Sequence, residues 1–114
     1  MGRTGVDEQD AIIFQYDDGQ QAILSASMRT DGARLATIGG PEGQIQIHRP
    51  WWKGEHLTLT HADKSTDTVA RPYEGNGYQF EAAHVMECLR KGRRESPVVS
   101  LDASLHLMHT LDAI

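Results

Sequence analysis

Apolar and polar residues alternate along the first part of the chain, and this period of two is typical of β-strands with one buried face. The clearest case is a pair of alternating runs on either side of Asp17-Asp18-Gly19, whose glycine supplies the positive φ that a tight hairpin turn requires. The apolar positions of these runs are Ile12, Phe14 and Tyr16 before the turn, and Ala22, Leu24, Ala26 and Met28 after it. We therefore expect an antiparallel hairpin here.

Four further strands are predicted before residue 71, with turns at Asp31-Gly32 and Gly39–Gly43. The expected strands are Ala33–Ile38, Gln44–His48, Leu57–Thr60 and Thr68–Ala70. The alternate positions of several strands are polar but uncharged, namely Ser25, Ser27, Gln44, Gln46, Thr58 and Thr60. A face of small uncharged side chains can meet another sheet. We therefore expect self-association, as a homodimer or a higher homo-oligomer, through this sheet face.

The period changes to 3.6 residues after Asn76, which predicts two amphipathic helices, Gly77–Lys91 and Ser100–Ile114. Gly92 follows the first helix as its C-terminal cap, and Ser100 supplies the N-cap of the second. Strands followed by helices indicate an α+β fold. We expect a mainly antiparallel six-stranded open sheet with the two C-terminal helices packed on one face.

The composition indicates a soluble globular domain and argues against several classes of partner. The 114 residues suffice for one domain, expected over residues 8–114 after a short tail at residues 1–7. The formal net charge is -5 with interspersed signs, so the sequence offers no basic face for nucleic acid or an anionic membrane. The single cysteine, Cys88, excludes an internal disulfide and a cysteine-based zinc site. A cytoplasmic location is the expectation.

Few residues carry a chemical signature. Gly39, Gly40 and Gly43 have the spacing of a phosphate loop, but an alternating strand follows instead of the helix N-terminus that such a loop needs. His106 and His109 are three residues apart on the second expected helix, yet no third ligand or paired carboxylate completes a metal site. We therefore predict no catalytic, cofactor-binding or metal-binding residues in this chain.

Substrate binding is the remaining kind of site that the residues suggest. Trp51 and Trp52 follow a strand, and tryptophan faces stack on sugars and flat apolar rings; an anchor at a sheet edge or subunit interface is the alternative. Arg71, Tyr73 and Asn76 lie between the last strand and the first helix, where a cleft rim is expected. These five residues are the candidate substrate-binding residues.

Three groups of motifs follow one another over about residues 8–114. The first comprises Phe14–Ala22, Ile38–Ile45 and Pro50-Trp51-Trp52, the second Tyr78–Ala82 and Cys88–Gly92, and the third Glu95-Ser96-Pro97, Ser100–Leu105 and Met108–Ile114. Together these motifs resemble the C-terminal domain of the Gfo/Idh/MocA family (glucose-fructose oxidoreductase / inositol dehydrogenase). Within that family, they are most similar to the branch of dihydrodiol and xylose dehydrogenases.

The resemblance implies an enzyme of two parts: an N-terminal Rossmann domain that binds NAD or NADP, and this domain, which lines the substrate cleft and makes subunit contacts. The chain has no G-x-G-x-x-G between a strand and a helix. It also lacks the family's Glu-Lys-Pro motif, whose lysine is usually catalytic, and the family's Asp and His motif. The resemblance therefore implies the substrate-binding and oligomerisation domain of an oxidoreductase acting on CH-OH groups of a sugar, polyol or dihydrodiol, inactive alone.

Two other functions remain open from the residues. A free-standing interaction module would use the sheet for self-association and carry out no chemistry. An independent small enzyme is disfavoured, because no nucleophile, base and orienting group can be assembled from the sequence.

Overall fold

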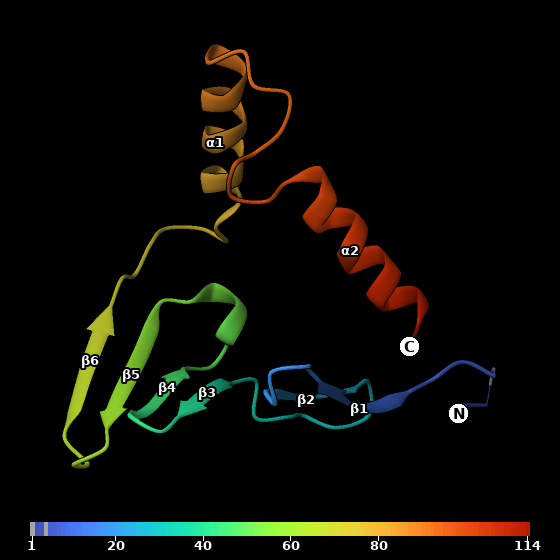
Figure 1. The fold of residues 1–114 in the computed structure, drawn as a ribbon, viewed down its shortest axis with the longest axis vertical. Coiled ribbons are helices and arrows are strands. Elements are labelled where there is room, and N and C mark those ends of the chain that lie inside the picture. Colours follow the sequence, from blue (N-terminus) through green and yellow to red (C-terminus); the bar gives the residue numbers. More distant parts are fainter. Residues whose placement is uncertain (1, 4) are drawn as a thin grey trace. The chain divides into compact units, whose positions relative to one another are not determined.

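The structure, a computed structural model, describes residues 2–3 and 5–114, and the chain divides into two compact units, Met1–Ala70 and Arg71–Ile114. The first unit contains the strands and the second contains the helices (Figure 1). The strands are β1 (Gln9–Gln15), β2 (Gln21–Ser27), β3 (Ala36–Gly40), β4 (Gly43–Ile47), β5 (His56–His61) and β6 (Thr66–Ala70), with a short 3-10 helix, η1 (Trp51–Lys53), before β5. Strands followed by helices, with antiparallel strand pairing, confirm the α+β class.

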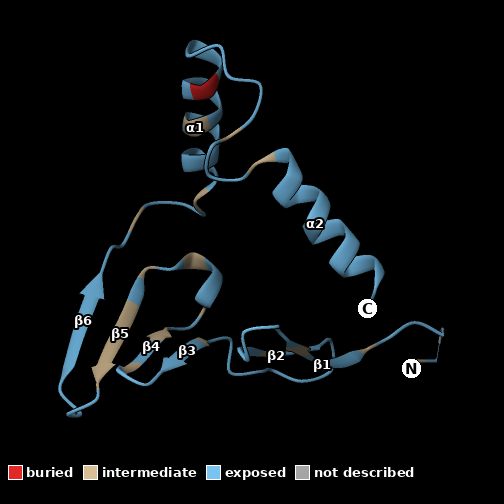
Figure 2. Cartoon of the chain, viewed as in Figure 1, coloured by how far each residue is buried: buried red, intermediate tan, exposed pale blue. Residues whose placement is uncertain are grey.

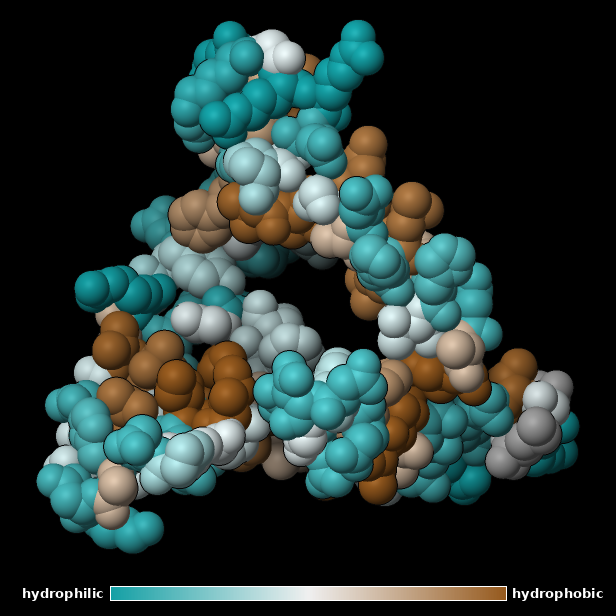
Figure 3. Space-filling view, viewed as in Figure 1, coloured by the Kyte–Doolittle hydropathy of each residue, from teal (hydrophilic) through white to brown (hydrophobic). Residues whose placement is uncertain are grey.

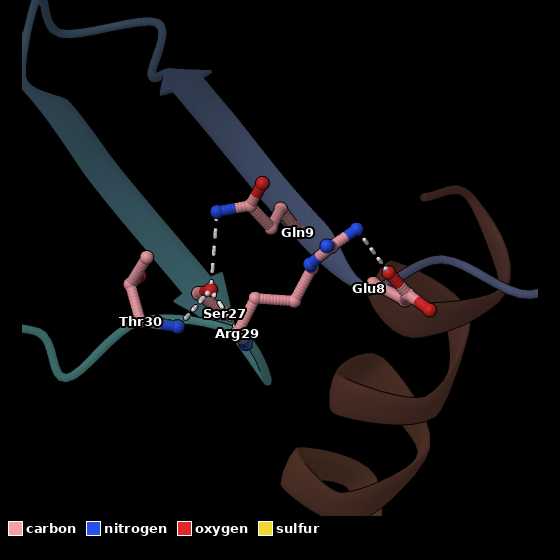
Figure 4. A network of polar contacts seen from close by, with 5 residues as sticks. All are labelled: Glu8, Gln9, Ser27, Arg29 and Thr30. Carbon is pink, nitrogen blue, oxygen red and sulfur yellow. Dashed lines mark hydrogen bonds and ion pairs between the residues drawn. The ribbon is translucent and has the colours of Figure 1, made fainter. Parts of the chain in front are cut away.

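The prediction of one six-stranded sheet is wrong, because β1 and β2 form a two-stranded sheet while β3, β4, β5 and β6 form a four-stranded sheet in that order. The segment between β2 and β3 leaves the extended conformation. The Ser27 hydroxyl accepts the backbone N–H groups of Arg29 and Thr30, both at 3.1 Å, and the Arg29 guanidinium pairs with Glu8 at 3.0 Å (Figure 4). Local bonds of this kind compete with the pairing of strands.

The predicted strand Ala33–Ile38 begins later than expected, at Ala36. Arg34 explains the delay, since its φ of 52° lies in the left-handed region that extended strands do not visit. The polar face expected across both sets of strands is therefore divided. Ser25 and Ser27 belong to the two-stranded sheet, whereas the glutamines and threonines belong to the four-stranded one.

The predicted hairpin is confirmed as β1–β2. Ile12 lies opposite Leu24 on one face, and Ile13 lies opposite Ile23 on the other. The connecting loop is a turn followed by a left-handed glycine: the Gly19 N–H donates to the Tyr16 carbonyl at 2.9 Å, and Gly19 has a φ of 86°. This loop type joins antiparallel strands with the correct twist.

The four-stranded sheet has two chemically different faces. One face carries a row of uncharged polar side chains across all four strands, Thr37, Gln46, Thr58 and Thr68, with Gln44, Thr60 and Thr66 in the next row. The other face carries Ala36, Ile38, Ile45, Ile47, Leu57, Leu59 and Val69, together with the paired His61 and Asp67 side chains. Apolar side chains gather over this sheet in Figure 3. The alternation therefore predicted the faces of these strands correctly.

The helices are α1 (Tyr78–Arg90) and α2 (Leu101–Asp112), close to the predicted ranges. The Ser100 hydroxyl caps α2 by accepting the Ala103 N–H at 3.1 Å. Gly92, with a φ of 65°, ends α1, and the next N–H, that of Arg93, returns to the Cys88 carbonyl at 2.9 Å. The packing of both helices on one sheet face stays a prediction.

Burial within the described part of the chain is slight. Cys88 is the one described residue that is buried (Figure 2), and its thiol lies 3.6 Å from Nε2 of His84. The same His84 nitrogen lies 2.8 Å from the Ser96 hydroxyl, which also accepts the N–H of Val98 and of Val99. These contacts attach the loop between the helices to α1.

Candidate functional site

Trp51 and Trp52 are two adjacent exposed aromatic residues of the first unit. They lie on η1, which connects β4 to β5, and their rings meet edge to face with centroids 6.2 Å apart. Their exposed fractions are 49% and 59%, so about half of each residue's surface is open to solvent. An exposed pair of this kind can stack on a sugar or an apolar ring, or anchor an interface.

Local hydrogen bonds hold η1 and the following Gly54, which together form the tryptophan turn. The Trp51 N–H donates to the Arg34 carbonyl at 2.9 Å, which ties the turn to the segment before β3. The Gly54 N–H donates to the Trp51 carbonyl at 3.1 Å, and Gly54 ends the turn with a φ of 62°. Arg49 and Pro50, just before the turn, are joined by a cis peptide bond. The tryptophans thus stand on a turn fixed at both ends.

A cluster of charges supports the same turn. The Asp31 carboxylate pairs with the Arg49 guanidinium at 2.8 Å and with the Arg34 guanidinium at 2.8 Å. The hydrogen bond from Arg49, with the positive charges of both arginines, holds the pKa of Asp31 below its ordinary value. Asp31 therefore joins the segments on either side of β3 and β4.

The sequence interpretation missed this cluster. Asp31 was expected to act only through its backbone, as a turn residue beside Gly32. Arg34 is only three residues away, whereas Arg49 lies 18 residues away, and no local sequence pattern relates Asp31 to Arg49.

The other three candidate residues, Arg71, Tyr73 and Asn76, belong to the second unit. The Tyr73 ring packs edge to face on Phe80, with centroids 5.2 Å apart. Its hydroxyl lies beside Gly77, where a Cβ would come within 3.2 Å of it. Tyr73 therefore packs against the first turn of α1 and holds the segment that leads into this helix. Whether these three residues meet the tryptophans in one cleft remains a prediction, because the two groups lie in different units.

The glycine-rich segment Gly39–Gly43 forms the turn between β3 and β4, and Gly40 is paired with Gly43. A strand follows it, as the sequence predicted, so it does not present a helix N-terminus to a phosphate. A hollow of about 410 Å³ lies beside this turn on the apolar face, where Ile38, Ile45, Leu59 and His61 contribute to its lining. Few polar groups line this hollow, and it carries no recognisable chemistry.

Among residues 2–3 and 5–114, no three or more His, Cys, Asp or Glu side chains come together in a way that could hold a metal ion. None of the helices formed by these residues is long and apolar enough to cross a membrane.

The chain is similar to curated dehydrogenases over nearly its whole length. It is 34% identical to trans-1,2-dihydrobenzene-1,2-diol dehydrogenase of Xenopus tropicalis, over 98% of this chain and 36% of that protein. The human and pig enzymes of the same name are 31% and 32% identical, each over 97% of this chain and 35% of their own length. The chain thus spans about a third of the length of the curated relatives that it matches. No protein-family model matches the chain.

Proposed function

We propose that this chain is the substrate-facing and assembly part of an NAD(P)-dependent oxidoreductase of the Gfo/Idh/MocA type, and that it is inactive alone. This proposal rests on how much of this chain and how much of each relative the similarity covers. The similarity extends over 97–98% of the chain but over only 35–36% of proteins named as dehydrogenases. The motifs in all three groups point to the same family, and the α+β arrangement fits the C-terminal domain that the resemblance implies.

The dinucleotide is held, in this proposal, by the remainder of the parent enzyme. The sequence does not fit NAD or NADP, because it has no G-x-G-x-x-G between a strand and a helix, and Gly39–Gly43 leads into β4 and not into a helix. The chain's own contribution is then to bind and orient the substrate. The nicotinamide that reacts with the CH-OH group of this substrate is held by the rest of the enzyme.

The substrate class that we propose is a dihydrodiol, or a related sugar or polyol, bound at the tryptophan turn. A trans-dihydrodiol presents a flat ring and two adjacent hydroxyl groups. The exposed Trp51 and Trp52 suit the ring. Arg71, Tyr73 and Asn76 supply donors and acceptors for hydroxyl groups, provided that the second unit brings them to the same cleft.

Self-association through the uncharged face of the four-stranded sheet is part of the same proposal. That face carries mainly Gln and Thr side chains, with His56 on β5 and His48 in contact with the Thr58 hydroxyl, and its strands place none of the Lys or Glu residues there that commonly keep sheets apart. A stable interface needs at least about 1,000 Å² of buried surface. A four-stranded face of this kind is a suitable platform for it.

Calorimetric titration of the chain with NAD(H) and NADP(H) tests whether the dinucleotide is bound by the rest of the parent enzyme and not by this chain. We expect no heat above that of dilution, and micromolar binding of either dinucleotide would contradict the proposal. The native reading frame supplies a second test, since we expect it to encode a nucleotide-binding domain joined to these residues. A frame encoding only these residues would favour the free-standing module.

The tryptophans are tested in the full enzyme. Trp51→Ala and Trp52→Ala should raise KM for the diol by about fivefold or more, because stacking of an aromatic face is worth roughly 1–3 kcal/mol. The dissociation constant for the dinucleotide should stay unchanged. An unchanged KM in both variants would assign the tryptophans to anchoring.

A further inference from the structure

The outer edge of β1 is an unpaired row of backbone donors and acceptors. The β1–β2 ladder is anchored by the Tyr16 N–H, which donates to the Gln20 carbonyl, and by the Met28 N–H, which donates to the Glu8 carbonyl, both at 2.9 Å. Antiparallel pairs alternate between hydrogen-bonded and non-hydrogen-bonded, so the even-numbered residues of β1 point their N–H and C=O groups toward β2. The outward groups belong to Gln9, Ala11, Ile13 and Gln15, and β1 has β2 as its one sheet neighbour in the described chain.

This edge lacks most of the usual protection against pairing with another strand, and Asp10 is its one charged residue. β1 is seven residues long and contains no lysine, proline or glycine, and its pairing with β2 runs without a bulge from Gln9 to Gln15. The edges of the four-stranded sheet are less suitable because β3 and β6 have only five residues each, and β3 ends in two glycines. The β1 edge is therefore the most favourable strand template in the described part of the chain.

The edge of β2 is the closest competitor, because it is also seven residues long and, unlike β1, carries no charged residue. Its end is occupied, however. The Ser27 hydroxyl accepts the N–H groups of Arg29 and Thr30, and the chain turns away there (Figure 4). Outward positions of β2 are also poorer in strand-forming residues, since Gln21, Ser25 and Ser27 accompany a single Ile23.

A two-stranded sheet is marginal in water and needs a third strand or a packed face for stability. The β1–β2 hairpin lacks such a packed face on one side. Ile13 and Ile23 lie opposite each other there, and their exposed fractions are 68% and 77%. We propose that β1 pairs antiparallel with β1 of a second copy of this chain, about a two-fold axis at Ile12. The product is a continuous four-stranded sheet, β2–β1–β1–β2, shared by the two copies.

The register follows from the outward residues. Placing the axis at Ile12 sets Gln9 opposite Gln15 of the second copy and Ala11 opposite Ile13 of the second copy. All four outward residues of each strand are then paired, with about eight backbone hydrogen bonds across the axis. Any other register leaves outward residues unpaired.

Side chains agree with this register. Ile12 meets Ile12 of the second copy on the face that already carries Leu24, so an apolar row crosses all four strands. Asp10, the only charged residue of β1, comes opposite Phe14 of the second copy, and the two Asp10 carboxylates do not meet. The edge is therefore self-complementary in both backbone and charge.

Disulfide trapping tests the axis. Residues that face each other at non-hydrogen-bonded positions have Cα atoms about 4.5 Å apart, within the range that a disulfide bridges. In a Cys88→Ser background, Ile12→Cys should form a covalent dimer under mild oxidation. The matched control is Leu24→Cys, which lies on the two-fold axis that β2–β2 pairing would use. We expect the yield of dimer to be at least tenfold greater for Ile12→Cys than for Leu24→Cys. Equal trapping, or trapping at Leu24→Cys alone, would overturn the proposal.

Proline substitution at the edge gives an independent test. Ala11 and Ser25 lie opposite each other, and both point their N–H groups outward, so proline at either site removes no bond of the hairpin ladder. In a Thr58→Glu background, which removes association through the four-stranded face, we expect Ala11→Pro to halve the mass-average molecular weight measured by light scattering and Ser25→Pro to leave it unchanged, with circular dichroism showing both folded. A wild-type chain that stays at 12.6 kDa at tens of micromolar, or an Ala11→Pro variant that still associates as the Thr58→Glu chain does, would overturn the proposal. Variants of the four-stranded face, such as Thr58→Glu, do not touch β1, so the two interfaces are distinguished.

Discussion

Gln46 on β4 lies directly opposite Thr58 on β5, and both side chains are half-buried at the centre of the uncharged sheet face. Thr37 and Thr68 extend the row to the two edge strands. Four uncharged polar side chains in line across a sheet leave no electrostatic obstacle to a facing protein surface. The row is therefore the most sensitive place to test association through this face.

Introducing a charge into this row should weaken the face-to-face association. We expect Gln46→Glu and Thr58→Glu each to raise the dimer dissociation constant about tenfold or more, because a carboxylate desolvated without a partner costs at least about 1–3 kcal/mol. Analytical ultracentrifugation measures the effect. Thr30→Glu, the same change of charge in the loop after β2, is the control and should leave the constant unaltered. Unchanged association in both sheet variants would exclude this face as an interface.

In the turn between β5 and β6, Lys64 has a strained backbone conformation that a substitution can relieve. Lys64 has a φ of 71°, in the left-handed region, and its N–H donates to the His61 carbonyl at 3.0 Å. The conformation costs a non-glycine residue about 1–2 kcal/mol, whereas glycine adopts it freely but loses about 0.5–1 kcal/mol of unfolded-state entropy. Lys64→Gly should therefore raise the free energy of unfolding by about 0.5–1 kcal/mol in urea titrations. Lys64→Ala, which keeps the strain, should give no gain, and a destabilised glycine variant would refute the account.

Acid should loosen the tryptophan turn through Asp31. The hydrogen bond from Arg49 lowers the pKa of this carboxyl from its ordinary value of 3.8. A lowered pKa in the folded state means that the ion pairs stabilise the fold above pH 3.8, and that this stabilisation is lost as the pH falls through the folded value. Since Trp51 and Trp52 are the only tryptophans, their fluorescence reports this turn directly.

We expect the tryptophan emission to change as the pH falls below about 4 and to lose that transition in Asp31→Asn. Asp18→Asn, in the β1–β2 turn, removes a different carboxylate and should keep the transition. A transition of equal size in both variants would show that Asp31 does not control the turn.

Periodicity predicted the parts of the fold that are local. The runs around Gly19, the strand Gln44–His48 and both helices each show their period within a dozen residues, and each was found close to its expected range. Which strands pair is a different question. The division into two sheets depends on Arg34 being left-handed and on the Ser27 hydroxyl, neither of which alters the alternation.

The candidate site divides in the same way. Trp51 and Trp52 are neighbours in sequence, so their meeting in space could be predicted. The support of their turn could not be predicted, because Asp31 and Arg49 are joined across 18 residues of chain. Tyr73 was expected at a cleft rim, and its packing against Phe80 at the start of α1 depends on the left-handed Gly77, with a φ of 91°.

The last prediction concerns Gly43, at the start of β4. A Cβ built there would lie 2.1 Å from the Thr60 carbonyl oxygen, a backbone atom that cannot move without breaking the pairing of β4 with β5, and φ is 145°. Gly43→Ala should therefore destabilise the first unit by about 3 kcal/mol or more, since the clash and the unfavourable backbone add. Gly40, its partner across the same turn, has nothing within 4 Å of a built Cβ. Gly40→Ala is the matched control, and urea unfolding should show a change of at most about 1 kcal/mol. Similar losses in the two variants would mean that the close approach to Thr60 does not constrain this turn.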